Sequence, residues 1–174
     1  MSFYFAACRT ETDQQRYLEF LLDHHDRLQL PYPFSVAFSY LASPILLGRE
    51  AFLCYNGNGD VVGAFGFIQG TGEHDYEDVH VLQVQIAYVL PAYRGTLLFF
   101  KALQVMERLI AGLEDKAEEL RFWAPDDGYL RRLFGKMAER TASRKTAFGV
   151  IDEYRVSFPA LQAYTAKYRR KSYL

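Results

Sequence analysis

Residues 79–96 read VHVLQVQIAYVLPAYRGT, and the fold can be predicted outward from this stretch. Its first twelve residues are largely apolar at both odd and even positions. Such a run is typical of a strand in the middle of a sheet that is covered on both faces. Pro91 then starts a short turn that ends at Thr96. The stretch therefore predicts a buried strand that leads through a tight turn into the next element.

The next element is the clearest helix in the sequence. Apolar residues recur three or four positions apart, which is the spacing of one helical face. Gly112 marks the expected end of the helix. The predicted buried stripe is Phe99, Leu103, Met106, Ile110 and Leu113, with Lys101, Gln104, Glu107 and Arg108 facing away from it.

The sequence before this stretch predicts two helices between strands. Residues 2–8 favour a strand, and Thr12 to Gln15 match a capping box at the start of a helix that ends near Pro31. Residues 31–44 predict a loop and a short second helix. Residues 51–55 and 61–70 predict a hairpin around the glycine- and asparagine-rich turn 56–60.

After the central helix, residues 119–124 predict a strand and residues 126–140 a helix. Residues 146–158 predict one strand or a short hairpin, and residues 159–174 a last helix. The order β-α-α-β-β-β-α-β-α-β predicts an α/β fold of three layers, with a mixed central sheet flanked by helices. We expect residues 1–174 to form a single domain.

Composition excludes several classes of function. The net charge is −1, which gives no electrostatic case for binding nucleic acid or an anionic membrane. Cys8 and Cys54 lie far apart, as expected of reduced intracellular thiols, and the four histidines form no metal-ligand motif. The N-terminus lacks the features of a signal peptide. We therefore expect a cytoplasmic protein without a metal site.

The turn after the long strand is a candidate anion site. The first amides of a helix have no intrahelical acceptor, and the helix dipole favours an anion such as phosphate there. Arg94 adds positive charge, Gly95 allows a ligand to approach the backbone, and Thr96 can cap the helix or bind a phosphate oxygen. A strand, turn and helix with one arginine is also common architecture, so this pattern alone leaves both interpretations open.

The motifs around this turn resemble those of the GNAT acyltransferases. Val89-x-Pro-x-x-Arg94-Gly95 is similar to the acyl-CoA motif of that family, and Val61-Val62-Gly63 resembles the start of the preceding strand. Asp127-x-x-Leu130-x-x-Leu133-Phe134 is similar to a third family pattern, so the resemblance covers roughly 51–138. It implies that acetyl-CoA is bound by Tyr88, Val89, Arg94, Gly95, Thr96, Leu97, Leu98 and Phe99.

The sequence also departs from the family. Leu97 stands where the family has its second glycine, and Phe99 where it has a third small residue. Gln85 occupies the position of a glutamate that serves the family as a base, and an amide cannot act as one. Phe134 aligns with the tyrosine that serves the family as general acid. Both standard proton-transfer residues are therefore missing.

Other residues are candidates for the remaining roles. Gln83 and Gln85 are expected on one strand face, either as a satisfied amide pair or as substrate ligands, with Gln85 the candidate catalytic residue. Tyr129 is a candidate replacement acid, or else a surface aromatic residue. By analogy with the mobile first-helix region of the family, Tyr32 and Phe34 are candidate substrate contacts.

Two functional hypotheses follow. The first is an N-acyltransferase that moves an acetyl or longer acyl group from acetyl-CoA to an amine by direct attack in a ternary complex. The second is a catalytically silent domain of the same fold, which acts by binding a protein partner or a second copy of itself. A coincidental match within an unrelated α/β domain is a third, weaker reading. The sequence does not identify the acceptor amine.

Overall fold

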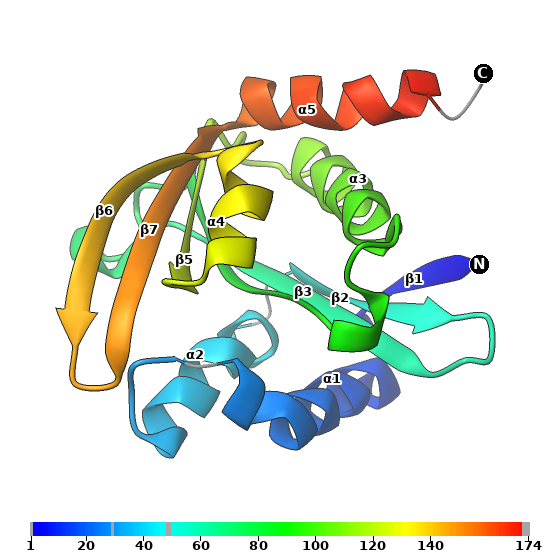
Figure 1. The fold of residues 1–174 in the computed structure, drawn as a ribbon, viewed down its shortest axis with the longest axis horizontal. Helices are drawn as coiled ribbons and strands as arrows, with labels where there is room; N and C mark the ends of the chain where they lie inside the picture. The colour runs from blue at the N-terminus through cyan, green and yellow to red at the C-terminus, as the bar shows by residue number, and fades with distance from the viewer. Residues whose placement is uncertain (1, 29, 48–49, 172–174) are drawn as a thin grey trace. The chain divides into compact units, whose positions relative to one another are not determined.

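The structure is a computed structural model that describes residues 2–28, 30–47 and 50–171. The chain divides into two compact units. Unit 1 comprises Met1–Ile68 and Gln85–Met106, and unit 2 comprises Gln69–Val84 and Glu107–Leu174. In the described residues, seven strands form one mixed sheet in the order β1-β2-β3-β4-β5-β7-β6, and five α-helices accompany them (Figure 1). The predicted α/β class with a mixed sheet is therefore confirmed, whereas the single domain stays a prediction.

Three strands at one end of the sheet form an antiparallel meander. They are β1 (Phe3–Ala7), β2 (Glu50–Asn56) and β3 (Val61–Gln69). In the turn between β2 and β3, the side-chain oxygen of Asn56 accepts the amides of Asn58 and Asp60 at 3.0 and 2.9 Å. Gly59 has a φ of +84°, which glycine adopts without strain. The predicted hairpin is confirmed.

The two N-terminal helices differ from prediction at their ends. Helix α1 (Glu11–His24) is capped by Thr10, whose hydroxyl accepts the amide of Asp13 at 3.1 Å, so the prediction of Thr12 as the cap was wrong. The helix ends well before Pro31 and continues as the 3₁₀ turn η1 (His25–Arg27). Helix α2 (Phe34–Leu46) includes Pro44 and extends beyond it.

Helices α1 and α2 cover one face of the strands of unit 1 (Figure 1). The core between them is built from aromatic and aliphatic residues, and the phenol of Tyr17 donates to the Leu41 carbonyl over 2.9 Å. Gly66 allows this close packing, because a Cβ at that position would lie 2.9 Å from the Tyr17 oxygen. The buried members are Cys8, Tyr17, Phe20, Leu21, Leu41, Ala42, Ala51, Leu53, Tyr55, Ala64, Ile86 and Tyr88.

The long predicted strand is β4 (Val81–Val89), and it leads through η3 (Pro91–Tyr93) into α3 (Leu98–Ala111). The first turn of α3 packs on the opposite side of the unit 1 strands from α1 and α2, since the rings of Phe99 and Phe65 lie 6.0 Å apart. The expected three layers are thus present in unit 1. Glu107 was predicted to face away from the core but is buried, and it accepts a hydrogen bond from Gln162.

Unit 2 contains η2 (Gly72–His74), the first half of β4 and the C-terminal elements. Strand β5 (Glu119–Pro125) pairs in parallel with residues Val81–Val84 of β4 and antiparallel with β7 (Gly149–Ser157). Helix α4 (Gly128–Gly135) is shorter than predicted, because β6 (Glu139–Thr146) begins where the helix was expected to continue. Strands β6 and β7 form a hairpin, and α5 (Phe158–Lys171) follows as predicted.

No helix in the described part of the chain is long and apolar enough to cross a membrane. Within the same residues, no three histidine, cysteine, aspartate or glutamate side chains gather in a way that could hold a metal ion.

Candidate active site

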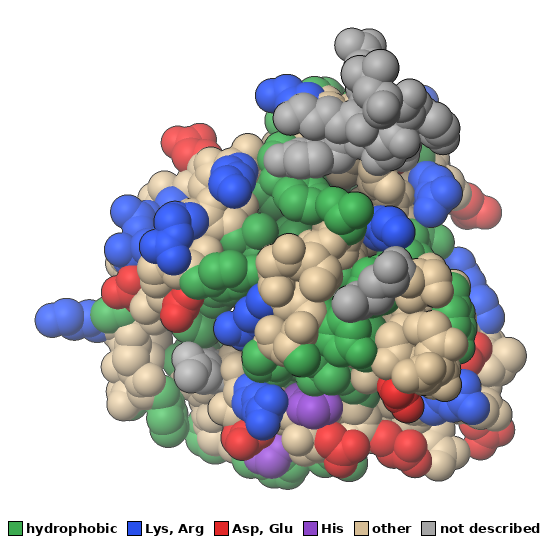
Figure 2. Space-filling view, turned by 45° about the vertical axis from the view of Figure 1, so that its right-hand side comes forward, with side chains coloured by type: hydrophobic (Ala, Val, Ile, Leu, Met, Phe, Trp, Pro, Cys, Tyr) green, Lys and Arg blue, Asp and Glu red, His purple; other side chains and the backbone are tan. Residues whose placement is uncertain are grey.

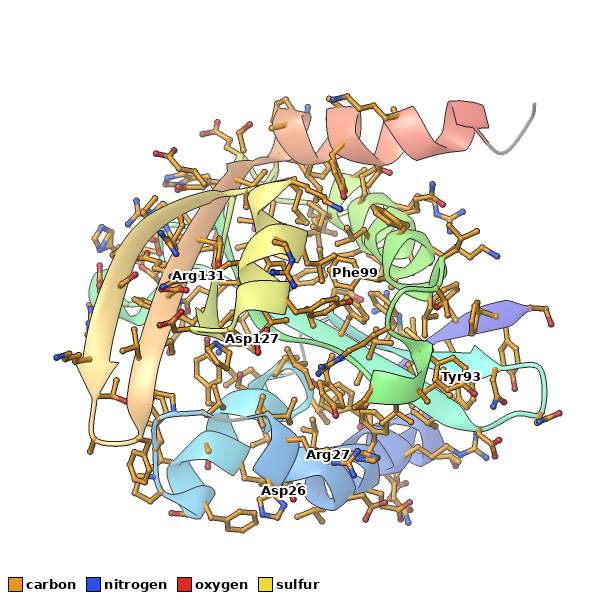
Figure 3. All side chains as sticks on the ribbon, in the orientation of Figure 1. Asp26, Arg27, Tyr93, Phe99, Asp127 and Arg131 are labelled. Atoms are coloured by element: carbon orange, nitrogen blue, oxygen red, sulfur yellow. The ribbon has the colours of Figure 1, made fainter. Side chains whose placement is uncertain are left out.

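The turn between β4 and α3 is tied to the β2–β3 hairpin. The amide of Leu90 donates to the Val62 carbonyl at 2.9 Å, directly after the strand. The phenol oxygen of Tyr93 accepts a hydrogen bond from the Asn56 side chain at 3.0 Å, and its ring meets that of Phe3 edge-on at 5.9 Å. Figure 3 labels Tyr93 in this turn and Phe99 in the first turn of the helix. The turn is therefore held by contacts with the β2–β3 hairpin and with β1, as well as by its own backbone.

Thr96 lies two residues before the helix, and its side chain binds the backbone on both sides. Its hydroxyl donates to the Tyr93 carbonyl at 2.6 Å and accepts the amide of Leu98 at 3.3 Å. Gly95 has a φ of +79°, and an added Cβ there would meet no atom within 4 Å. The backbone at this point is open to an approaching ligand.

Two amides of the turn have no acceptor within the described part of the chain, those of Gly95 and Leu97. Arg94 is exposed beside them. The side chain of Leu97 is 61% exposed, so it projects into solvent and is not packed onto the turn. Two backbone donors, a guanidinium and the start of a helix fit a phosphate-type anion.

The other predicted cofactor residues are more deeply placed. Tyr88 and Val89 are the last, buried residues of β4, and Leu98 is fully buried with its amide already bound by Thr96. Tyr88 lies with its ring 6.1 Å from that of Phe20, and its hydroxyl has no partner among the described residues. Backbone atoms of Val89 and Leu98 can contact a ligand, whereas their side chains belong to the core.

Gln85 is held by helix α2. Its side chain is 7% exposed, and its Nε2 donates to the hydroxyl of Ser43 at 3.1 Å. That hydroxyl in turn donates to the Tyr40 carbonyl at 2.7 Å. The Oε1 of Gln85 is buried and accepts no hydrogen bond from any described residue. Gln85 thus presents a fixed, unused acceptor.

Of the predicted substrate residues, Phe34 begins α2 and Tyr32 lies in the loop before it, both in unit 1 with Gln85. Both are exposed. The ring of Phe34 stacks near Phe38 at 5.8 Å and meets His25 edge-on at 4.9 Å. Burial, together with the neighbouring phenol of Tyr32, raises the pKa of Tyr40 well above its usual range. Gln83 is half-buried and belongs to unit 2.

The aligned acid position, Phe134, lies in an aromatic cluster of unit 2. Its ring meets Phe122 at 4.9 Å and Tyr154 at 5.4 Å, both nearly perpendicular. The hydroxyl of Tyr154 is buried without a partner among the described residues. Tyr129 is half-buried on α4, one turn before Phe134.

Helix α4 is anchored by a buried carboxylate. The Arg131 guanidinium donates to both oxygens of Asp152, at 2.8 and 3.1 Å, and also pairs with Asp126 at 2.9 Å. The hydroxyl of Ser143 donates to Asp152 at 2.6 Å. These donors, Arg131 foremost, hold the pKa of Asp152 below its usual range. Figure 3 shows Arg131 on α4 and Asp127, the helix cap, at its start.

Sequence reasoning missed Ser43, Tyr93 and Asp152. Each acts through a partner remote in sequence, and none of the three was among the candidate site residues. Their contacts follow from packing, which no local motif encodes.

Several solved structures share this fold. A putative phosphinothricin N-acetyltransferase matches with a TM-score of 0.66 and 13% identity, over 90% of this chain and 99% of that one. A ribosomal-protein-alanine N-acetyltransferase from Brucella melitensis matches with 0.62 and 14%, over 90% and 99% of the two chains. A GNAT-family acetyltransferase from Staphylococcus aureus matches with 0.64 and 11%, over the same shares. No protein-family model and no curated protein matches the sequence.

Proposed function

We propose that this chain, which has the fold of the GNAT acetyltransferases, transfers an acetyl group from acetyl-CoA to an amine. The observation that carries the proposal is the turn from Arg94 to Leu97. Its open backbone at Gly95, its two amides without acceptors among the described residues and the exposed residue Arg94 suit the CoA pyrophosphate. The agreement between fold and motif argues against a coincidental match of the motif within an unrelated α/β domain.

In this mechanism the protein acts mainly by positioning. The thioester carbonyl would accept a hydrogen bond from a backbone amide near Val89, and the amine would attack the carbonyl carbon directly. The tetrahedral intermediate collapses as the C–S bond breaks, and the thiolate leaves with the electron pair. Orientation of two substrates can supply several kcal/mol of the barrier without a base.

Gln85 and Tyr129 take the two polar roles. Gln85 cannot remove a proton, but its Oε1 can accept an N–H of the amine and fix the direction of attack. The attacking nitrogen gives up its extra proton to water, and Tyr129 would donate a proton to the leaving thiolate and regain one from water. Tyr32, Phe34 and Gln83 are the proposed contacts of the acceptor. The matched structures are named for different acceptors, so the fold does not define this one.

Four departures support a second candidate, a silent domain that binds a protein partner. They are Gln85, Leu97, Phe99 and the buried ring of Phe134. The acetyltransferase is expected to bind acetyl-CoA, whereas the silent domain is expected not to bind it. We infer that either form acts as a single domain over residues 1–174. We also infer that either form is cytoplasmic, and the buried, unpaired thiols of Cys8 and Cys54 agree with this.

Calorimetry with acetyl-CoA separates the candidates. Arg94→Ala should weaken binding by about tenfold, the equivalent of one charge-assisted hydrogen bond. Arg108→Ala is the matched control, because Arg108 is an exposed arginine near the other end of α3. The difference should shrink with added salt. Absence of binding at millimolar acetyl-CoA, with no thiol release in the presence of amines, would contradict the enzyme and favour the silent domain.

A further inference from the structure

The buried side chain of Asn56 links the β2–β3 hairpin to the turn before α3. Its Oδ1 accepts the amides of Asn58 and Asp60, and these two backbone donors fix which end of the amide group faces the hairpin loop. Its Nδ2 donates to the Asp60 carboxylate at 3.1 Å and to the phenol oxygen of Tyr93 at 3.0 Å. Both ends of the Asn56 amide group are therefore engaged, and its orientation is set in the free protein.

Tyr93 connects Asn56 to the backbone of the turn. Its carbonyl accepts both the amide and the hydroxyl of Thr96, at 3.3 and 2.6 Å. The same hydroxyl accepts the amide of Leu98 at 3.3 Å. A series of hydrogen bonds therefore runs from the hairpin through Asn56 and Tyr93 to the two residues that flank Leu97.

Strand β1 holds the ring of Tyr93 from another direction. The ring of Phe3 meets it edge-on at 5.9 Å, and the ammonium of Lys101 on α3 lies 5.8 Å from the centre of the Phe3 ring. Figure 3 labels Tyr93 where the turn meets the hairpin. All of these residues belong to unit 1. The position of the Tyr93 ring is therefore fixed by contacts from both the hairpin and β1.

The segment held in this way contains the two amides proposed to bind pyrophosphate, those of Gly95 and Leu97. Gly95 has a φ of +79°, and glycine has access to many other backbone conformations. The side chain of Leu97 is 61% exposed, so it contributes little packing to the turn. If the segment were not anchored, only a fraction of the free protein would present both amides correctly, and the affinity for a ligand would fall by that fraction.

Charge alone does not define the position of an anion on this side of the molecule. Figure 2 shows separate basic side chains, with hydrophobic and acidic ones between them, on the side that carries β1 and the β2–β3 hairpin in Figure 1. Separate charges attract an anion but leave its position open. Two backbone donors held at fixed positions define that position. Recognition of pyrophosphate therefore depends on the orientation of the turn.

From these contacts we infer that Asn56 and Tyr93 are positioning residues for the acyl donor. They hold the amides of Gly95 and Leu97 in the orientation that binds the pyrophosphate, and neither side chain touches the ligand. The inference rests on the proposed acetyltransferase function. It adds to that function one residue at an unspecified position of the motif and a second residue 37 positions away in the sequence.

Tyr93→Phe removes the hydrogen bond to Asn56 and keeps the ring against Phe3. Because that bond is present with and without ligand, its loss lowers only the fraction of free protein that is ready to bind. Surface plasmon resonance with acetyl-CoA should show an association rate lower by about threefold to tenfold, the equivalent of one net hydrogen bond. The dissociation rate should stay within about twofold of wild type. A raised dissociation rate would show that the phenol contacts the ligand, and would overturn the positioning role.

Tyr4→Phe is the matched control. Tyr4 is an exposed phenol of β1, it stacks on Tyr55 of β2, and its oxygen lies near Gly59 in the same hairpin. The change removes a phenol oxygen beside the hairpin without touching the contact to Tyr93, so both rates should match those of wild type. An equal fall in the association rate for Tyr4→Phe and Tyr93→Phe would overturn the specific role of Tyr93.

Amide hydrogen exchange measures the order of the turn without any ligand. The amides of Thr96 and Leu98 are the donors within the turn, and in Tyr93→Phe they should exchange at least about threefold faster than in wild type or Tyr4→Phe. Unchanged exchange together with an unchanged Kd for acetyl-CoA would overturn the inference and leave the acetyltransferase intact. Faster exchange in a protein whose wild type binds no acetyl-CoA would overturn the role in donor binding together with the proposed function.

Discussion

The side-chain nitrogen of Gln85 donates to the hydroxyl of Ser43 over 3.1 Å, and this leaves the Gln85 oxygen buried without a partner among the described residues. A buried acceptor without a hydrogen bond costs about 1–3 kcal/mol. The arrangement is therefore unfavourable in the free protein and becomes favourable when a donor arrives. In the proposed reaction, the amine would be such a donor.

Gln85→Leu should separate function from stability. The leucine has a similar volume and removes the unpaired oxygen, so the free energy of unfolding should stay within about 1 kcal/mol of wild type or rise. The same change should lower kcat/KM for the amine by about tenfold, with the Kd for acetyl-CoA unchanged. Urea denaturation and steady-state kinetics measure the two effects. A less stable protein with full activity would show that Gln85 is structural.

Gln85→Glu should add the missing base. A carboxylate at this position can accept a proton from the amine, whereas wild-type protein depends on amine that is already neutral. Wild-type kcat/KM should therefore rise with pH towards the amine pKa, and the variant should show a flatter profile. Identical profiles would argue against contact between this side chain and the amine.

Elements with strong local patterns were predictable from the sequence. The β2–β3 hairpin, β4 and α3 each combine apolar periodicity with turn residues, and each was predicted correctly. Strand β6 was not predicted from the sequence, because all but one of its side chains are exposed and no apolar alternation marks it. At α1, two threonines stand close together, and the sequence does not decide which one caps the helix.

The candidate site was only partly predictable, for a related reason. The turn from Arg94 to Thr96 is encoded by consecutive residues, and its threonine hydroxyl contact and open glycine follow from their identities. The contact between Gln85 and Ser43 spans 42 positions, and the burial of Glu107 depends on Gln162. Such pairs are set by how helices pack on strands, so they emerge only with the tertiary structure.

Gly66 should tolerate no side chain. A Cβ at Gly66 would lie 2.9 Å from both the Tyr17 oxygen and a ring carbon of Pro44, which are packed in the core of unit 1. Gly66→Ala should lower the free energy of unfolding by about 1–3 kcal/mol, the usual effect of overpacking. Gly135→Ala is the control, because a Cβ there meets nothing within 4 Å. Equal urea midpoints for the two variants would contradict this account of the α2 contact.

Asp152 should contribute stability that depends on pH. Its side chain is 0% exposed and binds Arg131 and Ser143, which lower its pKa in the folded state. A lowered pKa gives stability that is present above the unfolded value, about 3.9, and is lost as pH falls through the folded value. Asp152→Asn should cost about 2 kcal/mol or more near neutral pH. Urea midpoints should show a smaller difference from wild type in acid, and an equal difference at both pH values would contradict the pairing.

Tyr129 and Tyr154 should differ in their effect on turnover. Both are phenols of unit 2, but Tyr129 is half-buried on α4, whereas Tyr154 lies in the aromatic cluster with Phe122 and Phe134. A proton donor must be reached by the leaving thiolate, which favours the more accessible phenol. Tyr129→Phe should lower kcat by at least about tenfold with the Kd for acetyl-CoA unchanged.

Tyr154→Phe is the matched control for Tyr129→Phe, since it removes a phenol oxygen that has no partner among the described residues. Its loss should leave kcat unchanged and should not lower the free energy of unfolding. The rate of thiol release under saturating substrates measures kcat for both variants. A fall in kcat for Tyr154→Phe alone would move the proton donor from α4 to β7, beside the ring of Phe134 that replaces the tyrosine of the family.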